Sequence, residues 1–172
     1  MEGVKRREVI LRELETATKP ISASRFAKEF KVSRQIVVGD VALLRAQGTE
    51  ILATARGYLL EINRDRQGIV FKIVCQHTLE QTEEELTTIV SLGGEIIDVI
   101  VEHPIYGDLT AGLHIKTAKD IDKFIKSYKQ SSASLLASLT SGIHLHTIRC
   151  ADEESAQRIK EALAKKGILY QG

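Results

Sequence analysis

Two short helical patterns lie close together in Ser22-Ala-Ser-Arg-Phe-Ala-Lys-Glu-Phe-Lys-Val-Ser-Arg-Gln-Ile-Val-Val-Gly-Asp-Val-Ala-Leu-Leu-Arg45. Ser22 and Ser33 each stand where an N-cap belongs, so we expect helices over 23–30 and from 34 to about 46. The connection between them is only three or four residues long, which is typical of a helix-turn-helix. The apolar residues expected to be buried in the second helix are Ile36, Val37, Val41 and Leu44.

The flanking segments extend this motif to a winged helix. Apolar residues at helical spacing predict an amphipathic helix over Lys5–Thr16, which Lys19-Pro20 stops. After Gly48, short apolar runs at 51–53 and 58–62 bracket Thr54-Ala-Arg-Gly57, which predicts a hairpin with glycine at the position that needs positive φ. We therefore assign residues 1–62 to a winged helix-turn-helix DNA-binding domain.

The side chains of the predicted recognition helix suit DNA. Its first residues face base edges in this class of motif, and here they are Ser33, Arg34 and Gln35. Arginine pairs with guanine and glutamine with adenine, each pair contributing roughly 1–3 kcal/mol of discrimination. Contacts to phosphate are expected from the basic residues Lys28, Lys31, Arg45 and Arg56, the last at the wing tip. The alternative is a protein-interaction module whose charges are merely solvated.

Composition and charge agree with a soluble regulator. Of the 172 residues 43% are hydrophobic and 27% charged, with no apolar run long enough for a membrane span and no signal-peptide pattern, so we expect a cytoplasmic protein. Residues 1–66 carry 13 Lys and Arg against 9 Asp and Glu, whereas residues 67–172 carry 11 against 14. The excess of basic residues in 1–66 and of acidic residues in 67–172 favours a polyanionic partner for the first part of the chain alone. Cys75 and Cys150 lack CxxC spacing and are expected to be buried structural thiols.

The second half of the chain has a different pattern. Residues 63–68 are polar and predict a linker. Beyond them, strands are expected over 69–77, 95–102, 109–116 and 143–150, and helices over 79–92, 118–129 and 152–165. The order is βαββαβ plus a terminal helix, which is typical of a ferredoxin-like domain over residues 69–172. The whole chain is therefore predicted to be α+β.

This topology predicts a cluster of metal-ligating side chains. The last strand should lie antiparallel beside the first, so that His77 at the end of one adjoins His144 and His146 at the start of the other. Residues two apart share a strand face, and Glu85 lies one or two turns into the covering helix. Three imidazoles and a carboxylate suit a divalent transition metal such as zinc, nickel, iron or cobalt. Alternatively, the histidines are ordinary strand residues satisfied by hydrogen bonds.

The two remaining histidines are expected outside this cluster. His103 falls in the turn after the second strand, which we place at the opposite end of the sheet. His114 is in the alternation phase opposite Leu113 and Ile115, so we expect it to face outward.

Residues 32–45 with the wing at 53–58 resemble the heads of niacin-responsive transcriptional repressors. The body is similar to their three-histidine (3H) domain, in His77 with Glu85, the His103-Pro-Ile-Tyr-Gly107 turn and the Ser141-Gly-Ile-His-Leu-His146 motif. The resemblance covers nearly the whole chain. Gly39 is an uncommon residue inside a recognition helix. The resemblance therefore does not indicate which bases this turn of the helix reads.

The resemblance implies a homodimeric repressor of genes for NAD biosynthesis or niacin uptake, with nicotinic acid as co-repressor. It also implies a metal, nickel or zinc foremost, held by the residues His77, Glu85, His144 and His146. A dimer predicts a pseudo-palindromic operator. Two rivals remain open: a metal-responsive regulator with no organic effector, and a metalloenzyme fused to a DNA-binding head. Against an enzyme, there is no phosphate loop and no nucleophile motif, and we expect no catalytic residues.

Overall fold

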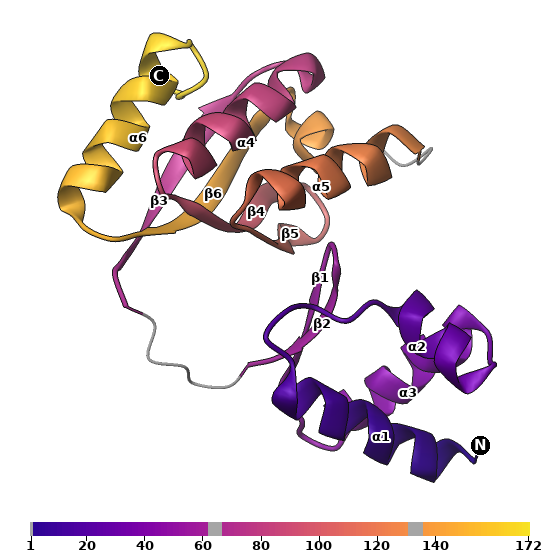
Figure 1. The fold of residues 1–172 in the computed structure, drawn as a ribbon. Coiled ribbons are helices and arrows are strands. Elements are labelled where there is room, and N and C mark those ends of the chain that lie inside the picture. The colour runs from indigo at the N-terminus through magenta and orange to yellow at the C-terminus, as the bar shows by residue number, and fades with distance from the viewer. Residues whose placement is uncertain (1, 62–66, 131–135) are drawn as a thin grey trace. The chain divides into compact units, whose positions relative to one another are not determined.

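The computed structural model describes residues 2–61, 67–130 and 136–172 (Figure 1). The chain divides into two compact units, Met1–Asp65 and Arg66–Gly172. Most of the predicted linker, residues 63–66, and the predicted strand residue Ile62 lie outside the described residues. No helix in the described part of the chain is long and apolar enough to cross a membrane.

The first unit is a winged helix. Its three helices are α1 (Gly3–Thr16), α2 (Ala23–Phe30) and α3 (Arg34–Ala46). The Ser22 hydroxyl accepts the Arg25 N–H at 3.1 Å and the Ser33 hydroxyl accepts the Ile36 N–H at 3.2 Å, so both predicted N-caps form. Lys31 ends α2 in the left-handed conformation, with φ of 56°. The turn between α2 and α3 is therefore as short as the sequence predicts.

The wing packs back onto the start of α2. Strands β1 (Ile51–Thr54) and β2 (Gly57–Leu60) pair as an antiparallel hairpin. Tyr58 and Ile21 exchange backbone hydrogen bonds of 2.8 and 3.0 Å, which adds a third extended segment. Gly57 has φ of +134°, and a Cβ there would lie 2.4 Å from the Ile21 backbone. Glycine is thus required at this turn, as predicted.

The prediction that Ile36 is buried was wrong. Ile36 is 44% exposed, whereas Val37, Val41 and Leu44 belong to the core of the first unit. These three are spaced four and three apart, so they follow one stripe of the helix, and Ile36 lies about 100° away from it. The stripe instead includes Asp40, a charged residue that is buried against α1.

Substitution Gly39→Ala is expected to stabilise the first unit by about 1 kcal/mol, because glycine costs that much relative to alanine inside a helix. Gly39 is exposed, and a Cβ added there meets nothing within 4 Å. The midpoint of urea unfolding measures the change. The matched control Ala42→Gly, at another exposed position of α3, should shift the midpoint the opposite way. A lower midpoint for Gly39→Ala would contradict the prediction.

The second unit is a four-stranded sheet with three helices on one face (Figure 1). Its strands are β3 (Ile69–Gln76), β4 (Glu95–His103), β5 (Gly107–Ile115) and β6 (Ile143–Cys150). Its helices are α4 (Thr82–Ser91), α5 (Ala118–Gln130) and α6 (Glu153–Lys165), with short 3-10 helices η1 (Leu79–Gln81) and η2 (Leu136–Thr140). The predicted α+β class and element order are confirmed.

The strand order departs from a ferredoxin-like sheet. It runs β5-β4-β6-β3, with each neighbouring pair antiparallel. The last strand, β6, lies between the first and second, and β3 is at the edge. Burial along the strands agrees with this order: every residue of β6 is buried or half-buried, whereas β3 has exposed residues such as Val70. The adjacency of β3 and β6 on which the predicted cluster depended is nevertheless present.

Candidate metal centre and nucleic-acid interface

Four predicted site residues converge in the second unit. The Glu85 carboxylate lies 2.6 Å from His77 Nε2, 3.0 Å from His144 Nε2 and 2.8 Å from His146 Nε2. All four side chains are at most 3% exposed. We call these four residues, His77, Glu85, His144 and His146, the His/Glu cluster.

The fold explains this convergence. Strand β6 is antiparallel to β3, with His144 opposite Cys75 and His146 opposite Ile73, so both histidines lie on the helix-covered face. His77 follows directly after β3, and η1 then turns the chain into α4. Glu85 lies in the first turn of α4 and is directed at the sheet. Two neighbouring strands and one helix therefore supply all four side chains.

The outer nitrogens of the three imidazoles are held by backbone carbonyls. The Nδ1 atoms of His77, His144 and His146 lie 2.7, 2.8 and 2.7 Å from carbonyl oxygens. Those carbonyls belong to Thr78, Gly142 and Asp98. Because a carbonyl only accepts, each Nδ1 must carry the proton and each Nε2 then presents a lone pair when the ring is neutral. This tautomer is the one that lets Nε2 bind a metal.

A positive species is required between these nitrogens and Glu85. Three lone pairs facing one carboxylate repel unless protons or a cation lie between them. Burial by itself disfavours the imidazolium, but the charge and hydrogen bond of Glu85 outweigh it and raise the pKa of His77 and of His146. Burial would likewise raise the pKa of Glu85, yet the charge of His146 and three hydrogen bonds hold it well below its ordinary value. The cluster is therefore built to hold positive charge, and its donor set fits a divalent transition metal.

Gly142 brings the His77 and His144 backbones together. It has φ of +88°, and a Cβ there would lie 2.4 Å from the His77 carbonyl oxygen. An open cavity of about 510 Å³ adjoins this crossing, and its walls, which include His77, are more apolar than polar. Its lining residues are Gln76, His77, Thr78, Leu79, Gln81, Ser141 and Gly142. The cluster thus borders a space that is large enough for a small organic molecule.

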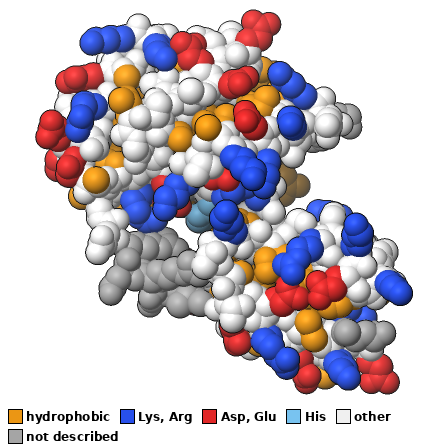
Figure 2. All heavy atoms as spheres, in the orientation of Figure 1, with side chains coloured by type: hydrophobic (Ala, Val, Ile, Leu, Met, Phe, Trp, Pro, Cys, Tyr) orange, Lys and Arg blue, Asp and Glu red, His pale blue; other side chains and the backbone are white. Residues whose placement is uncertain are grey.

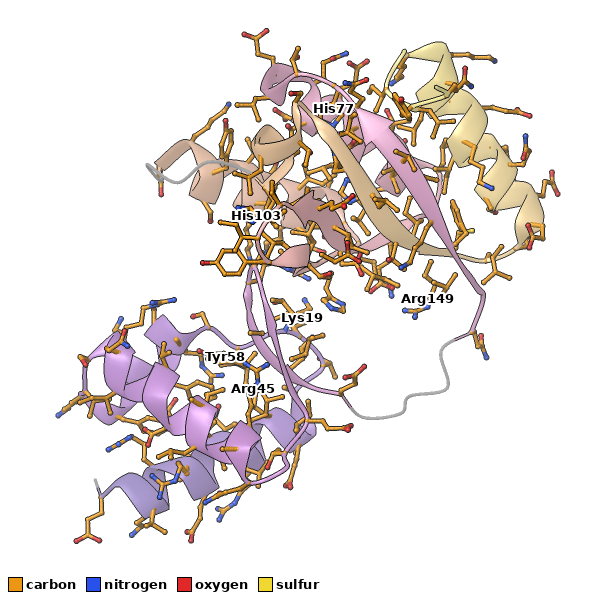
Figure 3. The ribbon with its side chains drawn as sticks, turned by 180° about the vertical axis from the view of Figure 1, so that it is seen from behind. Lys19, Arg45, Tyr58, His77, His103 and Arg149 are labelled. Atoms are coloured by element: carbon orange, nitrogen blue, oxygen red, sulfur yellow. The ribbon has the colours of Figure 1, made fainter. Side chains whose placement is uncertain are left out.

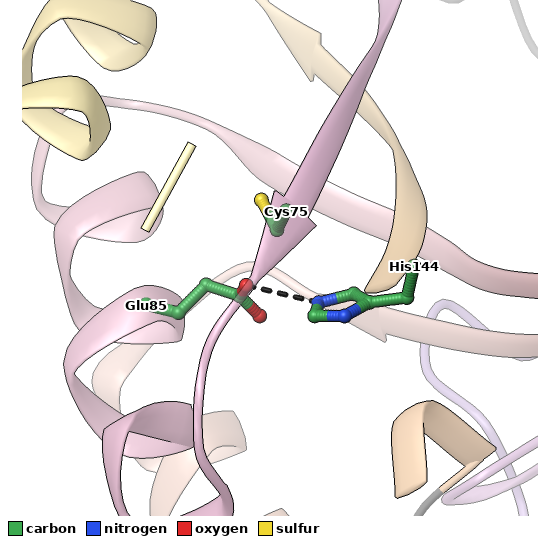
Figure 4. Close-up of side chains that lie close together, drawn as sticks. All are labelled: Cys75, Glu85 and His144. Atoms are coloured by element: carbon green, nitrogen blue, oxygen red, sulfur yellow. Dashed lines mark hydrogen bonds and ion pairs between the residues drawn. The ribbon is translucent and has the colours of Figure 1, made fainter. Parts of the chain in front are cut away.

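Cys75 was not predicted as part of the site. Its sulfur and ligand atoms of Glu85 and His144 all lie within 4.8 Å of one another (Figure 4). The thiol is fully buried, and burial together with the charge and hydrogen bond of Glu85 raises its pKa. The expectation of a buried thiol holds for Cys75 and for Cys150. Its phase in β3, shared with His77, was the sequence signal that placed it on this face.

The other histidines lie outside the cluster, but two expectations about them need correction. His103 lies at the same end of the sheet as His77, because β3 and β4 are both antiparallel to β6. It stays apart from His77 (Figure 3), and its Nδ1 accepts backbone N–H groups of Ile105 and Tyr106 in the turn. His114 has φ of 51° and is mostly buried, with its Nδ1 3.9 Å from Glu95, so it does not face solvent.

The predicted DNA-contacting residues are mostly on the surface of the first unit. Ser33, Arg34 and Gln35 are exposed at the start of α3, and Lys28, Lys31 and Arg45 are exposed around it. Arg56 is only half-buried, with its backbone N–H bonded to the Thr54 hydroxyl in the wing turn. Figure 3 shows Arg45 on α3. On the face drawn in Figure 2, basic side chains of this unit are interspersed with acidic ones.

Comparisons with known families agree with this division. The family model described as "3H domain" matches residues 70–172, and the one described as "HTH domain" matches residues 6–59. The first match covers well over half of the chain, so the chain belongs to the 3H-domain family and carries a helix-turn-helix head.

Two curated relatives span nearly the full length. The chain is 40% identical to the "Probable transcription repressor NiaR" of Thermotoga maritima, over 94% of this chain and 91% of that protein. It is also 40% identical to the "Transcription repressor NadR" of Bacillus subtilis, over 97% of this chain and 94% of that protein. Both relatives are named as repressors, which favours a DNA-binding regulator over the metalloenzyme rival.

Proposed function

We propose that this protein represses transcription of genes for NAD biosynthesis or niacin uptake. It binds a pseudo-palindromic operator as a homodimer in the cytoplasm, with nicotinic acid as co-repressor and a divalent transition metal, nickel or zinc, in the His/Glu cluster. Support for repression comes from the helix-turn-helix head and from the two relatives named as repressors. The observation that carries the sensing part is the convergence of three Nε2 atoms on the buried Glu85 carboxylate.

The cavity beside His77 supports a role for an organic effector. Nicotinate offers a pyridine nitrogen and a carboxylate, and a bound metal would supply Lewis-acid attraction for either group. The cavity walls add backbone groups and the side chains of Thr78, Gln81 and Ser141 as hydrogen-bonding partners. Nicotinate shifts the protein between two arrangements of its recognition helices only by its difference in affinity for them. We expect the favoured arrangement to fit half-sites roughly 34–36 Å apart, or a multiple of that distance.

A mobility shift tests the proposal, using the promoter region upstream of the protein's own gene. Metal-loaded protein should bind this DNA more tightly with nicotinate than without it.

Arg34→Ala should weaken specific binding by about 5- to 150-fold, the equivalent of roughly 1–3 kcal/mol from one lost base contact. Arg12→Ala, which removes an exposed charge from α1, is the matched control and should have a much smaller effect. A single asymmetric half-site in a footprint at saturation would contradict the dimer.

Calorimetry distinguishes the proposed nicotinate-responsive repressor from a metal-responsive regulator that has no organic effector. Titration of nicotinate into metal-loaded protein should release or absorb heat and should alter operator affinity. If neither changes while metal alone alters operator affinity, the protein is a metal sensor. Because His144 and His146 belong to the second unit and the helix-turn-helix belongs to the first, their substitution should leave salt-dependent nonspecific DNA binding intact.

The stabilisation that zinc confers is expected to grow with pH. In metal-free protein the raised pKa values of His77 and His146 stabilise the native state below the ordinary value of 6.5, and this contribution is lost as pH rises through the raised values. The lowered pKa of Glu85 contributes above its ordinary 4.5 and is lost as pH falls through the lowered value. Metal binding displaces the imidazole protons, so metal affinity rises with pH. Scanning calorimetry should give a larger zinc-induced increase in Tm at about pH 8 than at about pH 6. A smaller increase at pH 8 would contradict zinc binding by the His/Glu cluster.

A further inference from the structure

Cys75 lies in the hydrophobic core of the second unit and borders the His/Glu cluster. Its sulfur, a Glu85 carboxylate oxygen and a ring nitrogen of His144 are mutually within 4.8 Å, and all three residues are buried (Figure 4). This spacing is compatible with three donors around one ion. The trio shares Glu85 and His144 with the His/Glu cluster, so its sulfur lies beside the same proposed metal position.

The backbone fixes this placement. Cys75 and His144 are directly opposite each other in the antiparallel β3–β6 pair, so their side chains leave the same face of the sheet as neighbours. Glu85 approaches from α4 above the same face. The second thiol, Cys150, is at the far end of β6, where its sulfur donates to the Asp152 carbonyl at 3.3 Å. Only one of the two buried thiols therefore faces the cluster.

We infer that the Cys75 sulfur is an additional ligand of the cation held by the His/Glu cluster. The thiol proton leaves to solvent when the sulfur binds, so that a thiolate faces the cation. A thiolate is a softer donor than imidazole or carboxylate, and it biases a site toward zinc and similar ions over manganese or magnesium. The inference rests on the proposed metal site, and it assigns to the sulfur a strengthening of the preference that three imidazoles already give to zinc-like ions.

Cobalt substitution tests the inference spectroscopically. Full-length protein loaded with cobalt(II) should show a near-ultraviolet thiolate-to-cobalt charge-transfer band. Cys75→Ser and Cys75→Ala should lose this band while cobalt still binds, whereas Cys150→Ser, the matched control, should keep it. Cys75→Ser should also lower zinc affinity more than manganese affinity, with a zinc loss of about 10-fold or more, comparable to losing a supporting residue of a metal site.

X-ray absorption of the unmodified zinc-loaded protein gives a readout that needs no substitution. A sulfur neighbour at about 2.3 Å, distinct from nitrogen and oxygen at roughly 2.0–2.2 Å, is the expected result. Zinc bound with only nitrogen and oxygen neighbours, and cobalt bound without the charge-transfer band, would overturn the role of Cys75 and leave the metal site itself in place. No binding of either metal by calorimetry would overturn both.

Discussion

Glu85→Gln is expected to weaken zinc or nickel binding by about 100-fold. Four protein ligands share roughly 10–16 kcal/mol in structural zinc sites, so one ligand accounts for about 3 kcal/mol. Glu85 is the only carboxylate in the His/Glu cluster, and it faces all three Nε2 atoms. Glutamine keeps the shape of the side chain but removes its negative charge. Isothermal titration of metal into metal-free protein measures the loss.

The matched control for this substitution is Glu84→Gln. Glu84 precedes Glu85 on α4 but is directed outward, 3.7 Å from Lys166, and is about half exposed. Its substitution should leave metal affinity unchanged, since exposed ion pairs contribute little. Circular dichroism establishes that both variants are folded. If folded Glu85→Gln bound metal as tightly as the parent protein, Glu85 would not be a ligand.

Local patterns were sufficient to predict the elements of the fold. Ser22, Ser33 and Gly57 act through contacts only a few residues away or through their own backbone conformation, and each was recognisable in the sequence. The strand order of the second unit could not be recognised in the sequence. The residue alternation in β3 and in β6 suits either a central or an edge strand. What decides it is the pairing of β6 with β4, a contact between distant segments that leaves no local signal.

The candidate site was predictable for a related reason. Its convergence required only that β3 and β6 be neighbours, a feature common to the expected topology and the observed one. The carbonyl partners of the imidazoles were not predictable, since they are backbone atoms with no side-chain signature. Cys75 shares the strand phase of His77, but it was missed because its apolar surroundings in the sequence are those of an ordinary buried thiol. The buried ion pair of Arg6 with Asp40 was missed because charged residues on helices are usually exposed.

Asp40→Ala is expected to destabilise the first unit by about 3–5 kcal/mol, the usual consequence of leaving one buried charge without its partner. Arg6 Nε donates to Asp40 Oδ2 at 2.5 Å and Arg6 Nη2 to Oδ1 at 3.2 Å, and Arg7 adds a contact at 3.4 Å. The side chains of Arg6 and Asp40 are only 11% and 4% exposed, so water would solvate the guanidinium poorly once the carboxylate is removed. This pair joins α1 to the recognition helix, so its loss should also weaken operator binding. Urea unfolding measures the stability, and a mobility shift measures the binding.

Two further variants show whether the stability lost in Asp40→Ala comes from the uncompensated buried charge or from the loss of packing contacts. Glu13→Ala breaks an ion pair with Arg25 in which the arginine is 55% exposed, and it should reduce stability by no more than about 1 kcal/mol. The double substitution Arg6→Met with Asp40→Leu removes both charges and should recover most of the stability lost by Asp40→Ala, since apolar replacements of a buried pair are often neutral. If the double variant were as unstable as Asp40→Ala, the loss would come from packing between α1 and α3. In that event the uncompensated Arg6 charge would not be its cause.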